Sequence, residues 1–155
     1  MFLDKKKMAL FIFFAFFFIC FDRYLKYIAL HTNINFNILG NILRFNFAPN
    51  YNIAFSLPLG GLFLNILIPV IMVGLVFFII RMIKTRELLD TVAMLIIIFG
   101  ALSNYADRLL YGYVVDYFDL KYFTVFNVAD AMIVLGVGII IINGYKRDYL
   151  RKIKS

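Results

Sequence analysis

The chain has 155 residues, of which 64% are hydrophobic and only 16% charged, and its net charge is +7. A soluble globular chain is about half apolar and about a quarter charged, and one domain of this length could not bury so many apolar side chains beneath a polar surface. The composition therefore excludes a soluble globular domain and indicates an integral membrane protein with little room for an extramembrane domain.

The positive charge is concentrated in three clusters, each beside a long apolar segment. The clusters are Lys5, Lys6 and Lys7; Arg81, Lys84 and Arg86; and Lys146, Arg147, Arg151, Lys152 and Lys154. Basic residues in such positions mark the cytoplasmic ends of membrane spans and contact anionic headgroups. The charge thus indicates orientation in a membrane, and we expect no nucleic-acid partner. The single cysteine, Cys20, excludes a disulfide framework and a cysteine-based metal site.

Four apolar segments are long enough to cross a bilayer, which takes about 20 residues each. The predicted transmembrane helices are about residues 8–29, 62–80, 88–106 and 126–143. With all basic clusters on one side, they give a single membrane domain over 1–155, mostly α-helical, with N-in/C-in topology. Pro69 is expected to kink the second helix without ending it. The first segment lacks a small-residue cleavage site, so we expect a retained helix and not a cleaved signal peptide.

Two segments remain on the outer side, about residues 30–61 and 107–125. In the first, apolar and polar residues alternate over about 33–58 around Gly40 and Asn41, a pattern typical of a β-hairpin. A third short strand is expected from Tyr51 to Leu57. We therefore predict a small β-sheet on the outer face between the first two helices. The second segment contains six aromatic residues and is predicted to be an interfacial loop.

Ionisable and amide side chains gather near the outer membrane face, although each is costly there. They are Asp22, Arg23 and Lys26; Asn104, Asp107 and Arg108; Asp116 and Asp119; and Asn127 and Asp130. Asp22 and Lys26 can pair at i, i+4, either as an anchor at the interface or as part of a site. Several aspartates at one depth are harder to explain by packing alone, because like charges repel in a low dielectric.

Two asparagines each stand three residues before an aspartate on the same predicted helix face. These pairs are Asn104 with Asp107 and Asn127 with Asp130. Each asparagine could orient its neighbouring carboxylate, or it could make only an interhelical hydrogen bond. The spacing leaves both possibilities open.

Paired carboxyls are the remaining candidates for catalysis. Two close carboxyls can share one proton, so that one acts as a base toward water and the other as an acid. The only histidine, His31, is predicted in an outer loop, and Ser103 has no histidine near it in sequence. Zinc would need histidine or cysteine ligands, and a hard cation would need more oxygen ligands. We expect no metal and no cofactor.

Five short motifs follow one another along the chain. They are Asp22 to Lys26, Asn50 to Ser56, Gly100 to Leu109, Val114 to Tyr117, and Phe126 to Asp130. Together with four spans, they closely resemble the bacterial lipoprotein signal peptidase (signal peptidase II) family. Asn52 and Ser103 stand where the family has glycine, and the outer loop between Asp116 and Asp130 looks short. Asparagine is the residue that tolerates left-handed backbone best after glycine, and Ser103 is expected to widen a helix contact slightly.

The resemblance implies an aspartyl endopeptidase at the outer face of the bacterial cytoplasmic (inner) membrane. It implies removal of signal peptides from prolipoproteins by cleavage just before a diacylglyceryl-modified cysteine. The catalytic pair falls on Asp116 and Asp130. Supporting positions fall on Asp22, Lys26, Asn50, Gly100, Asn104, Asp107, Arg108, Asn127 and Ala129. The partners implied are diacylglyceryl-modified prolipoproteins and membrane lipid, and we expect a monomer.

Asp119 is expected to lie outside the catalytic pair, because two aspartates three residues apart in a tight loop constrain each other poorly. Two other functional classes remain as alternatives. A small proton-coupled transporter or channel would use Asp22, Asp107 and Asp130 as a relay, but no helix carries an acidic residue at mid-span. A structural membrane subunit would not need several carboxylates at one face.

Overall fold

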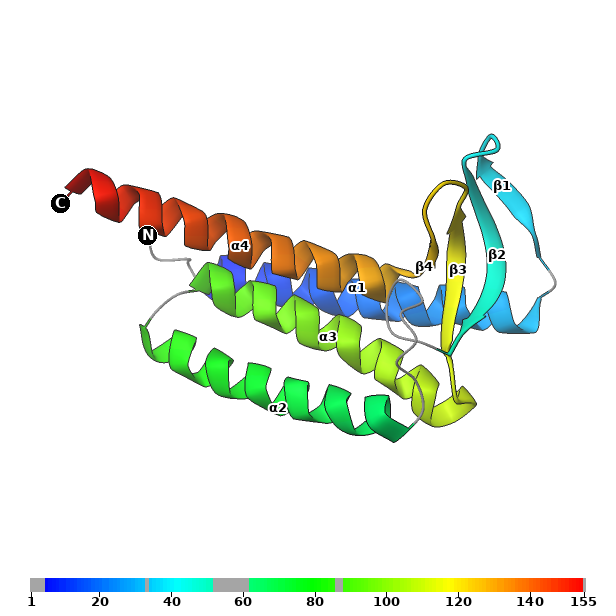
Figure 1. Cartoon of the computed structure of the whole chain (residues 1–155), viewed down its shortest axis with the longest axis horizontal. Coiled ribbons are helices and arrows are strands. Elements are labelled where there is room, and N and C mark those ends of the chain that lie inside the picture. Colours follow the sequence, from blue (N-terminus) through cyan, green and yellow to red (C-terminus); the bar gives the residue numbers. More distant parts are fainter. Residues whose placement is uncertain (1–4, 33, 52–61, 86–87, 155) are drawn as a thin grey trace.

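Four long helices and a small sheet make up the computed structural model, which describes residues 5–32, 34–51, 62–85 and 88–154 (Figure 1). The helices are α1 (Lys5–His31), α2 (Leu62–Thr85), α3 (Leu88–Tyr111) and α4 (Val128–Lys154). The strands are β1 (Phe36–Leu39), β2 (Leu43–Asn50), β3 (Val114–Leu120) and β4 (Val125–Phe126). Each helix extends beyond its predicted apolar span at one end or both, because the charged ends continue the helix past the apolar stretch. α2 continues through Pro69, as expected.

α3 is the central helix of the bundle and contacts each of the other three (Figure 1). Its closest approach is to α4, and glycine makes it possible at two points. A Cβ added to Gly100 would lie 2.5 Å from the Ala129 carbonyl oxygen, and one added to Gly136 would lie 2.7 Å from the Ala93 carbonyl oxygen. Both distances are shorter than any real side chain tolerates, so a larger residue would push the two helices apart.

Large apolar side chains cover the outside of the helices. On α1, Phe13 and Phe16 are 63% and 61% exposed, and α2 and α4 carry similar exposed residues. Such extensive apolar surface marks contact with lipid. Among the described residues, Leu88–Tyr111 and Val128–Ile153 are long and apolar enough to cross a membrane, and Ile66–Met82 is a shorter apolar helix. Two of the four expected spans therefore meet this criterion.

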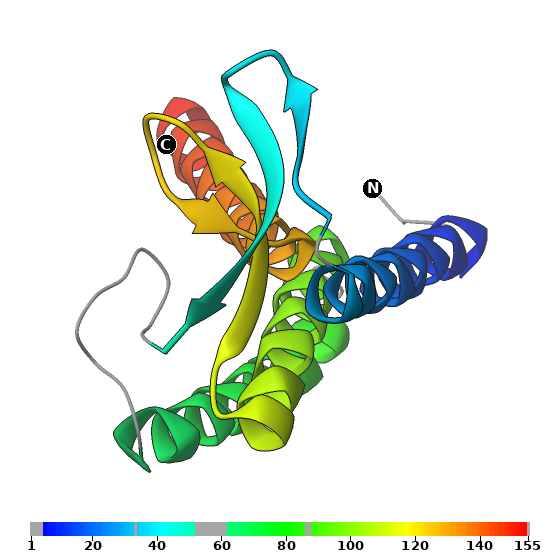
Figure 2. The same cartoon turned by 90° about the vertical axis from the view of Figure 1, so that its right-hand side faces the viewer.

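The sheet is antiparallel, in the order β1-β2-β3-β4, and it stands at one end of the bundle (Figures 1 and 2). The predicted hairpin is present: Phe36 pairs with Phe45, and Gly40 in the turn has a φ of +49°, which glycine accepts readily. A core of Ala29, Phe45, Val115 and Tyr117 joins the sheet to α1. Both ends of the described chain lie at the opposite end of the bundle (Figure 1).

The prediction that residues 107–125 form a loop is wrong. α3 continues to Tyr111, and the chain then forms β3, which pairs with β2. The sheet therefore combines strands from both outer segments and is not confined to the segment between the first two helices. Valine and aromatic residues at 114–118 suit a strand once β2 offers them a partner. The third strand expected from Tyr51 to Leu57 lies outside the described residues beyond Tyr51.

Candidate active site

The start of α4 fixes the orientation of Asp130. Asn127 caps the helix: its Oδ1 accepts a hydrogen bond from the Asp130 N–H at 2.8 Å, and its own N–H donates to Asp130 Oδ2 at 3.4 Å. This reciprocal pattern is a capping box. The other carboxylate oxygen, Oδ1, accepts a hydrogen bond from Asn104 Nδ2 at 2.7 Å. Both oxygens of Asp130 are thus held by groups from α3 and from the start of α4.

Asp116, in the middle of β3, is held by two asparagine amides. Its Oδ1 accepts from Asn127 Nδ2 at 2.6 Å, and its Oδ2 accepts from Asn50 Nδ2 at 2.9 Å. The Asn127 side chain therefore touches both aspartates, donating to Asp116 and accepting from the backbone of Asp130. The two aspartates come from different elements, and Asn127 links them: its side chain binds the Asp116 carboxylate and the Asp130 backbone, and its own N–H binds the Asp130 carboxylate.

The environment of Asp116 alters its acidity. The side chain is 1% exposed. Burial, reinforced by the nearby Asp130 carboxyl, raises the pKa of Asp116 to about 7, although the hydrogen bonds from Asn50 and Asn127 act in the opposite direction. A carboxyl with such a pKa exchanges its proton near neutral pH, which suits a general acid or base.

A buried ion-pair network supports the pair from the α1 side. Lys26 Nζ lies 2.9 Å from Asp22 Oδ2 and 2.8 Å from Asp107 Oδ2, and all three side chains are fully buried. Arg23 also pairs with Asp107. Lys26 Nζ further donates to Asn104 Oδ1 at 2.8 Å, and Asn104 in turn donates to Asp130, so Asn104 connects the lysine to Asp130. The expected i, i+4 pair is thus present and is part of a larger network.

Asp22 connects four elements, and two of its partners were not among the sequence-derived candidates. Its carboxylate accepts from Ser103 Oγ at 2.6 Å, from Tyr117 OH at 2.8 Å and from the Ala129 N–H at 3.2 Å. Tyr117 OH in turn accepts from the Val128 N–H at 3.0 Å, at the start of α4. The expectation that Ser103 only widens a helix contact missed its hydroxyl, which faces Asp22 across the α1–α3 contact.

The two possibilities left open for the asparagines turn out differently: Asn127 contacts the aspartate three residues on, whereas Asn104 makes an interhelical hydrogen bond. Asn104 donates to Asp130 in α4 and not to Asp107, its neighbour along the helix. Asp107 instead accepts from the Val115 N–H at 3.2 Å, which ties the end of α3 to β3. Every buried side-chain nitrogen and oxygen atom among the described residues has a hydrogen-bond partner. The polar cluster is therefore fully satisfied, as a buried network must be to be stable.

The remaining candidates also have definite positions. Gly100 allows the close contact of α3 with Ala129, directly before Asp130. Arg108 Nη1 donates to the Asn104 carbonyl oxygen at 3.4 Å, and its guanidinium lies within electrostatic reach of Asp130 and Asp116. Asp119 is the cross-strand partner of Arg44 in the β2–β3 register. It lies three residues from Asp116 along β3, and such an odd separation places the two side chains on opposite faces of the sheet.

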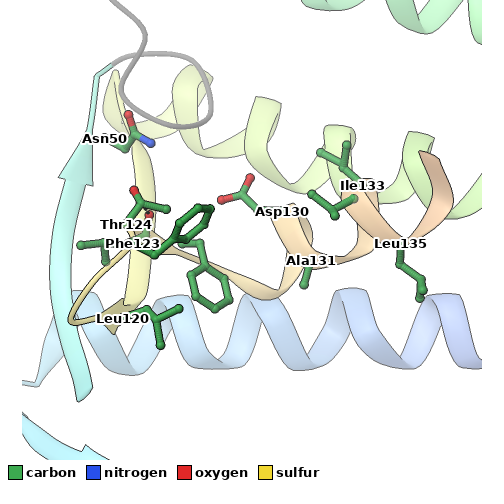
Figure 3. Close-up of a pocket in the computed structure, with 11 residues that line it drawn as sticks. Asn50, Leu120, Phe123, Thr124, Asp130, Ala131, Ile133 and Leu135 are labelled. Atoms are coloured by element: carbon green, nitrogen blue, oxygen red, sulfur yellow. Dashed lines mark hydrogen bonds between the residues drawn. The ribbon is translucent and has the colours of Figure 1, made fainter. Parts of the chain in front are cut away.

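Two cavities adjoin the aspartates. The larger, of about 540 Å³, is almost entirely apolar and has Asp130 in its wall (Figure 3). Its lining comes mainly from the β3–β4 hairpin and from α4, with Asn50 at the end of β2, and includes Leu120, Phe123, Phe126, Ile133, Val134 and Leu135. In Figure 3 the Asp130 carboxyl points toward Thr124 and Phe123 of the turn. The smaller cavity, of about 170 Å³, is mainly polar and has Asp116 in its wall.

Comparison with known proteins shows the family to which the chain belongs. The signal peptidase (SPase) II family model matches residues 14–146. The chain belongs to the signal peptidase II family. A lipoprotein signal peptidase of Halothermothrix orenii is 34% identical over 112 residues, which are 72% of this chain and 76% of the relative. One from Staphylococcus aureus (strain JH9) is 33% identical over 136 residues, 83% of each chain.

A solved structure supports the same fold. A bacterial membrane enzyme superposes with a TM-score of 0.79 at 33% identity, covering 89% of this chain and 88% of that one. Membership of the signal peptidase II family makes the chain an aspartic-type membrane peptidase. It therefore favours an enzyme over the transporter and the structural subunit.

Proposed function

We propose that this chain removes signal peptides from prolipoproteins, cutting just before a diacylglyceryl-modified cysteine, with Asp116 and Asp130 as the catalytic pair. The observation that carries the proposal is that the Asn127 side chain hydrogen-bonds to both aspartates, to the carboxylate of Asp116 and to the backbone N–H of Asp130, beside a large apolar cavity. The names of the relatives, lipoprotein signal peptidases, support the substrate class.

The chemistry follows from two carboxyls that share one proton. The ionised carboxylate takes a proton from water while the resulting hydroxide bonds to the scissile carbonyl carbon. The protonated carboxyl gives its proton to the carbonyl oxygen, and a neutral gem-diol forms. The carbon–nitrogen bond then breaks, the amine takes the proton held by the first aspartate, and one gem-diol hydroxyl returns its proton to the second. Water and peptide become an acid and an amine, and the pair regains its starting state.

The apolar cavity suits the substrate's hydrophobic parts. A signal peptide and a diacylglyceryl group both need an apolar environment, and the cavity lies between α4 and the β3–β4 turn with Asp130 at its wall (Figure 3). Apolar surface with a few polar groups is typical of a binding site for such ligands. We propose that acyl chains and leader lie along Ile133, Val134 and Leu135, with the scissile bond next to Asp130.

The other candidate residues are proposed to support the pair and not to react. Charged side chains neutralise one another in a frame around the pair: Lys26, Asp22, Asp107 and Arg108. Three asparagine amides orient the two carboxylates: Asn50, Asn104 and Asn127. Gly100 and Ala129 set the α3–α4 distance at the height of Asp130. Frames of this kind hold reacting groups close to their productive geometry.

We further propose that the site faces the outside of the bacterial cytoplasmic membrane, with both termini inside and the chain working as a monomer. Successive helices alternate in direction, and the aspartates lie at the sheet end, away from the basic clusters (Figure 1). In a Cys20→Ala background, single cysteines at Asn37 and Lys121 should be labelled from outside, and one at Lys84 should be protected. The opposite pattern would contradict the orientation.

The direct test of the function is cleavage of a purified substrate. The purified chain is incubated in detergent with a diacylglyceryl-modified prolipoprotein, and the product is analysed by mass spectrometry. We expect a shortened product whose new N-terminus is the modified cysteine. The same prolipoprotein without the lipid serves as the control and should be cut much more slowly. Cleavage at another bond, or no cleavage, would contradict the proposal.

A further inference from the structure

The two cavities beside the aspartates are chemically different and share one wall. Asn50, Thr124 and Val125 line both of them. Asp130 lines only the apolar cavity, and Asp116 lines only the polar one. The catalytic pair proposed above therefore lies on the boundary between an apolar space and a polar space.

Hydrolysis needs water at a site that also holds lipid. A cavity filled by acyl chains and an apolar leader leaves little room for water, because its wall is almost entirely apolar and offers few hydrogen-bonding groups. The polar cavity has room for several waters, since one water needs about 10–15 Å³ of such volume. Its wall offers the polar partners that bound water requires, namely the Asp116 carboxyl, the Asn50 amide and the Thr124 hydroxyl.

We propose that the polar cavity is a water-binding site that supplies the hydrolytic water to the aspartates, while the lipid-modified substrate occupies only the apolar cavity. This inference rests on the proposed function and adds the route by which its second reactant arrives. Substrate and water then approach the pair from different sides, so a bound substrate does not block the supply of water.

Ala48 gives direct experimental access to the polar cavity. It lines that cavity alone, and it is the cross-strand partner of Asp116 in the β2–β3 register. Directly opposed residues on neighbouring strands point to the same face of a sheet, so a larger side chain at 48 fills the space beside Asp116. The position is half-buried, and a β-branched residue suits a strand.

Ala131 provides a matched control on the other side. It follows Asp130 on α4, is exposed, and lines only the apolar cavity (Figure 3). The same substitution, alanine to leucine, can therefore be made once in each cavity. The two variants add the same volume and the same apolar surface, and they differ in which space they fill.

The experiment measures kcat and KM for a diacylglyceryl-modified prolipoprotein with Ala48→Ser, Ala48→Val, Ala48→Leu and Ala131→Leu. We expect kcat to fall with side-chain size at 48, by about tenfold or more for leucine, while KM stays within about twofold. Ala48→Ser, which adds a hydroxyl and little volume, should lower kcat least of the three. Ala131→Leu should raise KM and change kcat less.

Two results would overturn the water route. One is an unchanged kcat in both Ala48→Val and Ala48→Leu; the other is a rise in KM in place of the fall in kcat, which would mean that substrate occupies the polar cavity. Tm is measured for each variant, and if leucine unfolds the protein, the smaller valine decides the question. Cleavage by the unmodified chain is the separate test of the proposed function, so the two can fail independently.

Discussion

Replacing Lys26 with methionine should destabilise the protein strongly, because it removes a buried positive charge that two buried carboxylates share. Lys26, Asp22 and Asp107 are all fully buried, with Nζ 2.9 Å and 2.8 Å from the two carboxylates. Breaking a buried ion pair by removing one partner costs about 3–5 kcal/mol. Asp107 keeps its pairing with Arg23, so we expect a loss within that range and not twice as large.

Unfolding in detergent, followed by circular dichroism against temperature and denaturant, measures this loss. Arg23→Gln is the matched control on the same helix: Arg23 is 32% exposed, so its pairing with Asp107 should contribute only about 1 kcal/mol. Adding Asp22→Asn to Lys26→Met removes the unpaired charge and should recover about 1–3 kcal/mol. If Lys26→Met were as stable as the unmodified chain and Asp22→Asn alone abolished cleavage, the pair would be catalytic and its structural assignment wrong.

Three further predictions concern acidity, helix packing and the far end of the bundle. The pKa of Asp116 rises from an ordinary 3.8 in the unfolded chain to about 7 in the folded protein. Between these two pH values the folded state binds more protons than the unfolded state, so the free energy of unfolding falls as pH rises from about 4 to about 7. Asp116→Asn should therefore raise Tm relative to the unmodified chain more at about pH 8 than at about pH 5. Gly100→Ala should lower both stability and cleavage, because its Cβ would lie 2.5 Å from a carbonyl oxygen of α4, whereas Gly74→Ala, with nothing within 4 Å, should lower neither. Asp90→Ala should lower the free energy of unfolding by about 1–3 kcal/mol, since it removes the buried acceptor of Arg147, while cleavage by the folded protein persists. Unfolding curves and cleavage rates of these variants check all three.

Several features follow from sequence spacing alone because they are local. The hairpin around Gly40 is fixed by period-two patterning and a turn residue that accepts positive φ. The Asp22–Lys26 pair follows from the rise of one helical turn. The four apolar segments are helices in the structure, with ends that differ from the predicted spans because charged residues continue a helix beyond the bilayer core.

Other features depend on partners that are distant in the chain, and sequence spacing does not reveal those. β3 becomes a strand because β2, more than sixty residues earlier, offers it a free edge. Asn104 contacts Asp130 on another helix and not the aspartate one turn along its own. Tyr117 was interpreted as one of several interfacial aromatics, yet its hydroxyl donates to Asp22 in the core. A buried hydroxyl gains its partner from tertiary packing, so its role emerges only when the elements are assembled.

The central claim is that Asp116 and Asp130 act together, and the cleavage rates of three single variants test it most directly. Asp116→Asn, Asp130→Asn and Asp119→Asn are purified, checked for folding by Tm, and assayed with the same diacylglyceryl-modified prolipoprotein. Asparagine preserves size but cannot exchange the proton, so the first two should lose cleavage by at least about a hundredfold while Asp119→Asn stays close to the unmodified chain. Substantial cleavage by Asp116→Asn or Asp130→Asn, together with its loss in Asp119→Asn, would contradict the account.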